Sequence, residues 1–430
     1  MRLHELMIYR DLLEEDILHD MHFLMENVDN EYYNKEDLKA LLFDCIHGIL
    51  EVADGHGFIG NLWHVYLTYL LANNENAYSK ACEIKGQVEG SIDAVAKHDF
   101  EILKEYFDYD LSILEKELGV QGVSLLYNYK AVPHTKKLFN QRIRNRICDL
   151  AKELESAESV DVFQVTVTTF YKDFGVGKLG LHKAFRIGGT GADMQIIPIT
   201  NITHVHLDDL VGYEIPKKKL IDNTKAFVEG RKANNCLLFG DAGTGKSTCV
   251  KAILNQYYNQ GLRMIEIYKH QFQDLNNVIA EIKNRNYKFI IYMDDLSFEE
   301  FEIEYKYLKA VIEGGLEKKP ENVLIYATSN RRHLVREEFA DKVGRRDDLH
   351  ASDTVQEKLS LAARFGESIF FNGPSKKEFQ EIVLVLAEKN GIQMERDELL
   401  LESNKWEMSH GGKSGRTAQQ FIDHLLGTRL

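Results

Sequence analysis

The chain has 430 residues, 44% of them hydrophobic and only 5 of them proline, which indicates an ordered globular protein rich in helix and leaves room for two or three domains. Its 5 cysteines are scattered without a C-x-x-C pair, so the sequence argues against a zinc site and favours a reduced, cytosolic compartment. The net charge of -14 is concentrated at the start, because residues 1–60 hold fourteen Asp or Glu against four Lys or Arg, a balance of -10. Contacts to phosphate need cations, so this balance argues against nucleic acid wrapping the region.

The first sixteen residues, MRLHELMIYRDLLEED, carry charges where a signal peptide needs an unbroken apolar core. No apolar run elsewhere approaches the length that a membrane span needs. We therefore expect a soluble, cytoplasmic protein with no membrane partner.

Residues 1–155 are predicted to form an N-terminal, mainly helical domain. Apolar residues recur at helical spacing in KEDLKALLFDCIHGILEVAD, residues 35–54. The stretch LWHVYLTYLL, residues 62–71, is apolar nearly all round, which is typical of a helix inside a bundle. The alternative for that stretch is a groove for a ligand.

The pattern changes over residues 156–204, where we expect a β-containing linker. VFQVTVTTFY, residues 162–171, alternates as a strand does, and the glycine-spaced FGVGKLGLHKAFRIGG follows it closely. The G-x-G at Gly175 and Gly177 is too short a signal to predict a nucleotide site.

Residues 205–372 alternate between strand-like and helix-like runs. The runs CLLF, RMIEIY, KFIIYMDD, NVLIYATSN and SIFF are apolar and strand-like, and helical segments separate them. This alternation predicts an α/β domain, an αβα sandwich with a parallel sheet and helices on its faces. Residues 373–430 are again helical and are expected to form a small C-terminal lid.

Residues 240–247 fit the phosphate-binding pattern G-x-x-x-x-G-K-[ST], between a strand-like run and a helix-like run. The glycines allow backbone conformations closed to other residues, and the loop amides with the following helix N-terminus form a hollow for an anion. Lys246 is expected to reach the β- and γ-phosphates of ATP, and the Ser247 hydroxyl to bind Mg²⁺. The alternative is a glycine-rich turn that binds nothing. The predicted nucleotide-binding residues here are Gly240, Asp241, Ala242, Gly243, Thr244, Gly245, Lys246, Ser247 and Thr248.

Two carboxylates end the strand-like run KFIIYMDD, where α/β proteins place ligands. Asp294 is expected to hold Mg²⁺ through water, and Asp295 to orient and deprotonate the attacking water. The alternative is that the pair only caps a helix. The next strand-like run closes on Asn330, whose neutral amide can position water beside the γ-phosphate, although polar residues are common at strand ends.

The ordered set GDAGTGKST, YMDD, ATSN, LSLAARFGESIFFNG and GRTAQQFIDHLL resembles an AAA+ ATPase over residues 205–430. By that resemblance Arg364 corresponds to an arginine finger and Arg416, after Gly415, to a second sensor on the lid. The same architecture puts adenine between the lid and residues 211–215, which include Tyr213. LDDLVGYEIPK, DDLSFE, YATSNRRHL and EKLSLAARFG are similar to a bacterial AAA+ family known as domain of unknown function 815.

The Asp-Asp ending resembles the branch of AAA+ proteins that contains replication initiators, helicase loaders and transposition helpers, which assemble on or near DNA. We expect the chain to differ from the initiators in lacking an appended helix-turn-helix. It also lacks the aromatic-apolar-glycine signature of threading unfoldases between Tyr268 and Phe289.

The resemblance implies an ATPase that remodels or loads a macromolecular partner, with ATP and Mg²⁺ as cofactors, working as a homo-oligomer with an unidentified protein partner. Nucleic-acid binding is expected to be weak, because pairs such as Arg331 with Arg332 and Arg345 with Arg346 are more often solvated than binding. The absence of an N-K-x-D guanine reader favours ATP over GTP. The alternatives are a conformational switch with incidental turnover and a small-molecule kinase, and for Arg364 a structural pair with Glu357.

Overall fold

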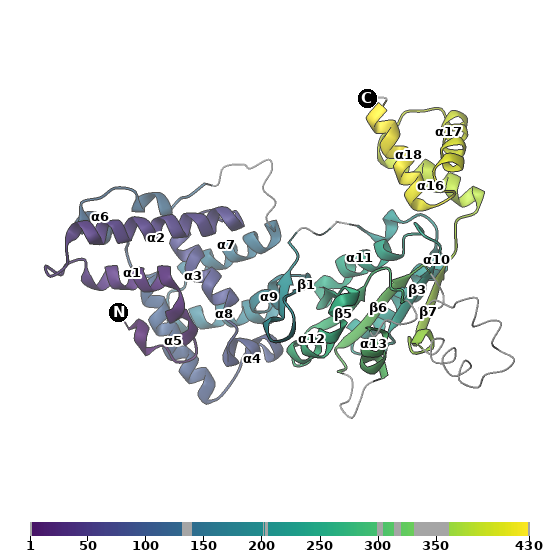
Figure 1. The fold of residues 1–430 in the computed structure, drawn as a ribbon. Helices are drawn as coiled ribbons and strands as arrows, with labels where there is room; N and C mark the ends of the chain where they lie inside the picture. The colour runs from purple at the N-terminus through teal and green to yellow at the C-terminus, as the bar shows by residue number, and fades with distance from the viewer. Residues whose placement is uncertain are drawn as a thin grey trace. The chain divides into compact units, whose positions relative to one another are not determined.

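The computed structural model describes residues 2–130, 140–200, 202, 205–298, 304–313, 320–330 and 361–428. These residues fall into two compact units, Met1–His182 and Lys183–Leu430, drawn in Figure 1. The boundary lies within the range where the sequence predicted a linker.

The described part of the first unit consists of helices joined by loops. Asn34 begins the longest helix, α2, by accepting a hydrogen bond from the Glu36 amide, and Gly57 ends it in the left-handed conformation with φ 70°. The helices are α1 Asp16–Asn27, α2 Lys35–His56, α3 Leu62–Asn73, α4 Ala77–Lys85, α5 Ser91–Phe107, α6 Ser112–Leu118, α7 Gln141–Glu155, α8 Val160–Phe174 and α9 Gly177–Leu181.

Helix α3 lies in the interior of this unit, as its apolar sequence predicted. Its polar atoms meet main-chain carbonyls, with Trp63 Nε1 2.9 Å from the Tyr106 oxygen and His64 Nε2 2.8 Å from the Phe107 oxygen. Because these contacts satisfy the polar groups that burial removes from water, α3 serves as a core helix and not as a ligand groove.

The strand predicted at residues 162–171 is wrong, because these residues belong to helix α8. Ser159 caps the helix by accepting from the Val162 amide. Phe163, Val167 and Phe170 are buried at a spacing of four and three, which is one face of a helix. Exposed Val165 and Thr169 lie between these buried residues and contributed to the apparent alternation, so the period was misassigned.

The second unit is built on a seven-stranded sheet with the order β2-β1-β4-β5-β6-β3-β7. All neighbouring strands pair in parallel except β1 and β2, which are antiparallel. The sheet therefore confirms the predicted α/β class. The strands are β1 Ala184–Gly188, β2 Gln195–Pro198, β3 Cys236–Gly240, β4 Leu262–Glu266, β5 Lys288–Met293, β6 Val323–Ser329 and β7 Glu367–Phe371.

Strands β1 and β2 lie within residues 156–204, the range in which the sequence predicted β structure. β1 pairs with β4 through Ala184–Met264, Phe185–Ile265 and Arg186–Glu266, so it extends the main sheet and does not form a separate element. Sequence spacing could not show this, because the pairing joins residues far apart in the chain.

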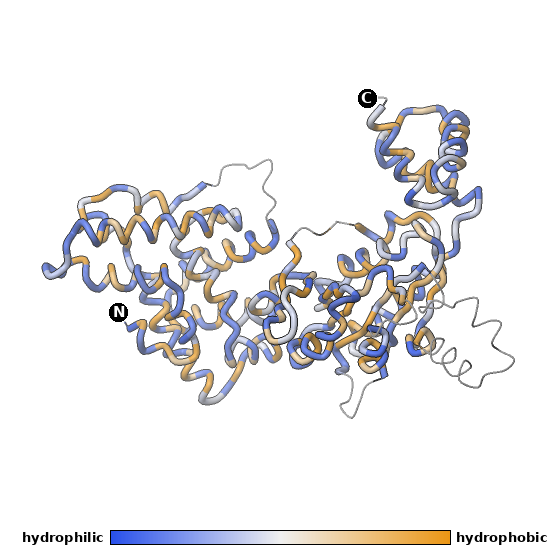
Figure 2. Tube along the Cα trace, viewed as in Figure 1, coloured by the Kyte–Doolittle hydropathy of each residue, from blue (hydrophilic) through white to orange (hydrophobic). Residues whose placement is uncertain are grey.

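Helices lie on both faces of this sheet, above and below the strands in Figure 1. On one face, α10 Glu214–Val228 and α11 Lys246–Tyr257 share a buried apolar cluster with β3, β4, β5, β6 and β7. The helices α12 Leu275–Ile282 and α13 Glu304–Glu313 lie on the other. Figure 2 shows hydrophobic traces along the strands, as expected for a sheet covered on both sides.

The C-terminal lid consists of α16 Lys376–Lys389, α17 Arg396–Ser409 and α18 Gly415–Thr428, around a small core of its own. Ser375 and Glu378 form a reciprocal cap that starts α16. Among the described residues, no helix has both the length and the apolar character needed to cross a bilayer.

Candidate active site

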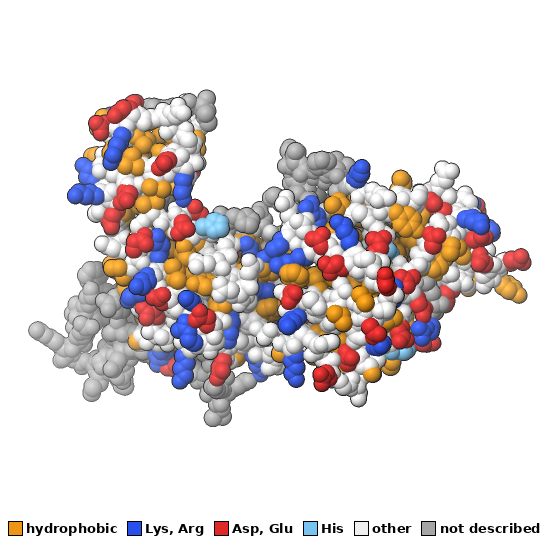
Figure 3. Space-filling model, turned by 180° about the vertical axis from the view of Figure 1, so that it is seen from behind, with side chains coloured by type: hydrophobic (Ala, Val, Ile, Leu, Met, Phe, Trp, Pro, Cys, Tyr) orange, Lys and Arg blue, Asp and Glu red, His pale blue; other side chains and the backbone are white. Residues whose placement is uncertain are grey.

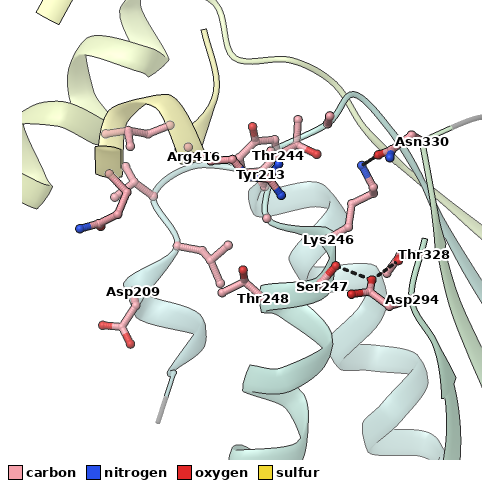
Figure 4. Close-up of a pocket in the computed structure, with 18 of the residues that line it drawn as sticks. Asp209, Tyr213, Thr244, Lys246, Ser247, Thr248, Asp294, Thr328, Asn330 and Arg416 are labelled. Atoms are coloured by element: carbon pink, nitrogen blue, oxygen red, sulfur yellow. Dashed lines mark hydrogen bonds between the residues drawn. The ribbon is translucent and has the colours of Figure 1, made fainter. Parts of the chain in front are cut away.

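A cavity of about 580 Å³ lies at the carboxyl ends of the central strands, between the glycine-rich loop of residues 240–247 and the lid. This is the edge of a parallel sheet where ligands bind. The loop comes from the β3–α11 connection, the carboxylates from the end of β5, and Thr328 and Asn330 from the end of β6. The remaining walls come from residues 209–213, α16 and α18 (Figure 4). The predicted residues that line the cavity are Tyr213, Ala242, Gly243, Thr244, Gly245, Lys246, Ser247, Thr248, Asp294, Asp295, Asn330 and Arg416.

The loop glycines pack too closely against their neighbours to accept a side chain. Gly243 has φ 75°, and a Cβ atom there would lie 2.9 Å from the Ser414 hydroxyl at the start of α18. Gly245 has φ 86°, and its Cβ would collide with the Leu210 side chain. The loop is therefore a cradle of main-chain atoms at which bulk is excluded, as a phosphate site requires.

Lys246 is buried at the first turn of α11. Its Nζ donates to the Gly240 oxygen at 2.9 Å, to the Asp241 oxygen at 2.6 Å and to Asn330 Oδ1 at 3.1 Å. Burial lowers the pKa of Lys246, and the carboxylates of Asp241, Asp295 and Asp294 oppose that shift. The Lys246 ammonium group is thus held between two main-chain oxygens of the loop and the side chain of Asn330.

Ser247 and Asp294 meet directly, with Ser247 Oγ donating to Asp294 Oδ1 at 2.6 Å. Thr328, at the end of β6, donates to the same carboxylate oxygen at 2.5 Å (Figure 4). Burial pushes the pKa of Asp294 upward, but these hydrogen bonds outweigh burial and hold it below its ordinary value. Asp294 is therefore a charged carboxylate at neutral pH.

Asp295 has φ 50°, a conformation that is uncommon for a residue with a side chain. Its amide donates to Thr328 Oγ1 at 2.9 Å, and its carboxylate accepts from Asn330 Nδ2 at 2.8 Å. Asn330 therefore bridges Lys246 and Asp295, since its carbonyl oxygen faces the first and its amide nitrogen the second.

The lid and the segment before α10 close the other side of the cavity. The Arg416 amide donates to the Gly243 oxygen at 3.3 Å, which places the start of α18 against the loop. Lys389 of α16 pairs with Asp209 at 2.9 Å, and this hydrogen bond lowers the pKa of Asp209. Tyr213 has φ 60°, and burial raises the pKa of its hydroxyl to about 12.

Three of the predicted site residues, Gly240, Asp241 and Arg364, do not line the cavity. Gly240 and Asp241 form the base of the loop, where the Asp241 carboxylate accepts from the Gly373 amide at 2.9 Å. Arg364 forms an ion pair with Glu313 of α13 and is not among the lining residues. Arg331, Arg332, Arg345, Arg346 and Glu357 lie outside the described residues.

Sequence reasoning missed several lining residues. Ile382 and Leu386 of α16, one helical turn apart, project an apolar wall that nothing distinguishes from lid core in the sequence. The others are Asp209, Leu210, Thr328 and Gln419. Of these, Thr328 had a usable signal, because it precedes Asn330 at a strand end.

The donor set suits Mg-ATP. The Ser247 hydroxyl and the Asp294 carboxylate are the hard oxygen ligands that Mg²⁺ prefers, used with waters. The loop amides and Lys246 suit phosphate oxygens, and the apolar wall of Leu210, Ile382 and Leu386 suits a flat base.

Across the face of the molecule drawn in Figure 3, acidic and basic side chains are mixed.

A model of the family described as "Protein of unknown function (DUF815)" matches residues 181–429. No curated protein matches the chain. Among solved structures, a proline-to-glycine mutant of Thermotoga maritima RuvB is 16% identical, covering 53% of this chain and 66% of its own, just under two thirds, with a TM-score of 0.37. The T. maritima RuvB Holliday junction branch migration motor is 15% identical over 52% of this chain and 72% of its own, with a TM-score of 0.33. The FIGL-1 AAA domain in complex with ADP is 16% identical over 53% of this chain and 75% of its own, with a TM-score of 0.36. These similarities are too distant to transfer an activity or a partner.

Proposed function

This chain belongs to the DUF815 family, whose description names no activity, and from its own residues we propose that it is an AAA+ ATPase that binds and hydrolyses Mg-ATP. The observation that carries the proposal is the hydrogen-bonded chain from Ser247 and Lys246 of one loop to Asp294, Asp295 and Asn330 at the ends of two strands. A glycine-rich turn that binds nothing would not require this network of hydrogen bonds.

Each residue has one task in this proposal. Lys246 neutralises charge on the β- and γ-phosphates, and Ser247 with Asp294 holds Mg²⁺, directly and through water. Asp295 accepts the proton of the attacking water, while Asn330 fixes the direction of the Asp295 carboxylate. Mg²⁺ supplies charge compensation at the phosphates when it is bound.

ATP is proposed as the nucleotide, with adenine against the apolar side of the cavity. Leu210, Val211, Ile382 and Leu386 come from both the lid and the segment before α10, so a base between them contacts both. Arg416 starts α18 beside the loop and is proposed to sense the phosphates.

We further propose that the chain acts as a homo-oligomer. Arg364 does not line its own cavity and pairs instead with Glu313. An arginine in that position contributes to hydrolysis only if it exchanges this pair for the γ-phosphate of a neighbouring copy.

The work done by hydrolysis is proposed to be remodelling or loading of a protein partner in the cytoplasm. Any nucleic-acid binding by this protein is proposed to be weak and salt-sensitive, because such contacts are mainly to phosphate. The resemblance to the initiator and helicase-loader branch supports this class of function. The competing candidate is a conformational switch, in which binding matters and turnover does not.

The test compares ATP binding and hydrolysis by the parent chain and Lys246→Ala. Lys219→Ala is the matched control, because Lys219 lies in the same unit but pairs with Glu367 at 3.4 Å, outside the cavity. We expect Lys246→Ala to lose affinity for ATP and Lys219→Ala to keep it. Equal affinities in the two variants would exclude the site, and tight binding with negligible turnover under all conditions would favour the switch.

A further inference from the structure

Thr328 contacts three successive residues of the turn that carries both carboxylates. Its hydroxyl donates to Asp294 Oδ1 at 2.5 Å and accepts from the Asp295 amide at 2.9 Å, and its main-chain oxygen accepts from the Leu296 amide at 2.7 Å. Thr328 itself is 1% exposed, at the end of β6.

The Thr328 hydroxyl acts both as a hydrogen-bond donor and as an acceptor. The single proton is given to the Asp294 carboxylate, and a lone pair is given to the Asp295 amide. A valine in this place would have the same shape but neither bond, which would leave a partly buried amide and a carboxylate oxygen short of partners.

The two carboxylates need different directions for different tasks. Asp294 lies against Ser247, whereas Asp295 lies against Asn330. The two carboxylates can reach Ser247 and Asn330 because Asp295 adopts φ 50°. The hydrogen bond from the Asp295 amide to the Thr328 hydroxyl holds that conformation.

We propose that Thr328 is a positioning residue that sets the divergent directions of Asp294 and Asp295, a role that rests on the proposed ATPase function. Its hydroxyl orients the Mg²⁺-binding carboxylate and, through the Asp295 amide, the carboxylate that accepts the proton. In this role Thr328 acts through the two carboxylates and not by a reaction of its own hydroxyl.

The experiment compares Thr328→Val, Thr328→Ser and the control Thr224→Val. Thr224 is a fully buried threonine of the same unit. Its hydroxyl donates to the Leu220 main-chain oxygen at 2.8 Å and lies 2.8 Å from the Tyr326 hydroxyl, and it does not contact the two carboxylates. Both valine variants lose a buried hydroxyl, so general damage to the core affects them alike.

In ATP hydrolysis assays, Thr328→Val is expected to lower kcat about tenfold or more and to raise the Mg²⁺ concentration for half-maximal rate about tenfold, the usual size of such indirect effects on a metal site. Thr328→Ser is expected to restore both, because the hydroxyl returns. Thr224→Val is expected to leave both near the parent values. If the two valine variants match each other in kcat and Mg²⁺ requirement, the positioning role is wrong.

A second measurement separates this proposal from the function on which it rests. Amide hydrogen exchange of the protein without nucleotide is expected to be faster at Asp295 in Thr328→Val, and unchanged there in Thr328→Ser and Thr224→Val. Absence of ATP hydrolysis by the parent chain would refute the ATPase function, whereas unchanged exchange at Asp295 in Thr328→Val would refute the positioning of Asp295 by Thr328.

Discussion

The two units use buried polar groups in different ways. In the first unit, the fully buried Asp99 accepts from the amides of Met7, Ile8 and Tyr9, and thereby fastens the N-terminal segment. In the second unit, the buried Lys246 donates to Asn330 Oδ1 and Ser247 donates to Asp294 Oδ1, at the wall of a cavity. Buried polar groups that close on the protein's own backbone stabilise a fold, and those that converge on open space are available to a ligand.

Backbone strain follows the same division. Of the described residues, Tyr213 and Asp295 are the two that combine a side chain with positive φ, and both line the cavity. In the described part of the first unit, positive φ values belong to glycines. Strain that surrounding structure maintains at a cavity is a mark of function, and it supports the second unit as the site of chemistry.

Charge separates the units as well. Residues 1–182 hold 31 Asp or Glu and 18 Lys or Arg, a balance of -13, so nearly all of the net charge of -14 belongs to the first unit. The second unit, near neutral, can hold a polyanionic nucleotide without long-range repulsion of its own.

The largest effect is expected when two variants of the second unit that hydrolyse ATP poorly, Arg364→Ala and Lys246→Ala, are mixed. Arg364→Ala is expected to bind ATP but to hydrolyse it about 10³-fold more slowly, and Lys246→Ala to bind poorly. Because each variant keeps the residue that the other lacks, a mixture is expected to regain activity at interfaces that combine an intact Lys246 with an intact Arg364. Hydrolysis by the mixture, with light scattering to show mixed oligomers, is the measurement.

A mixture that stays inactive although mixed oligomers form would assign Arg364 to the structural pair with Glu313. An active protein that remains a monomer with ATP would lead to the same conclusion. Either result would leave the second unit's site complete within one chain.

Asp295→Asn is expected to lower kcat by about 10²-fold or more with ATP and Mg²⁺ still bound, because an amide cannot accept the proton of the attacking water. Asp99→Asn, the matching change in the first unit, is expected to leave kcat unchanged. Steady-state hydrolysis and Mg²⁺-dependent ATP binding measure both. Parent-like turnover by Asp295→Asn would show that Asp295 is not the base.

The reverse result is expected for stability. Asp99→Ala leaves three amides without their acceptor and should lower the free energy of unfolding of the first unit by about 3 kcal/mol. Asp108→Ala, which removes an exposed pair with Lys104, is the control and should cost below about 1 kcal/mol.

Trp63 of the first unit and Trp406 of the second are the 2 tryptophans of the chain, so Trp63 fluorescence in a Trp406→Phe background follows the first unit alone during urea unfolding. Equal losses for Asp99→Ala and Asp108→Ala would contradict a structural role for the buried carboxylate.

The smallest expected effect concerns pH. The pKa of Asp294 is lower in the folded protein than its ordinary value, so ionised Asp294 stabilises the second unit above the ordinary pKa, and this contribution is lost as pH falls through the folded pKa. Asp294→Asn is therefore expected to flatten the acid limb of thermal stability below about pH 4. Calorimetry on Asp294→Asn and on the exposed control Asp222→Asn tests this, and identical acid limbs for Asp294→Asn and the parent would show that Asp294 adds no acid sensitivity.

The sequence by itself determined the glycine-rich loop between β3 and α11, the five central strands and the C-terminal helices. Their signals are local, since the loop needs glycines, lysine and serine at fixed spacing, and each central strand is a continuous apolar run. It also placed Asp294, Asp295 and Asn330 at strand ends, where parallel strands bring their carboxyl ends to one edge.

Only the tertiary structure decided the rest. Residues 162–171 became helix α8 because burial of one helical face outweighed the strand preference of valine and threonine. Ile382 and Leu386 became a cavity wall, and Thr328 a partner of three residues on the neighbouring strand's turn, through contacts between distant parts of the chain. Such contacts depend on packing between elements, and residue type and spacing within one element do not encode them.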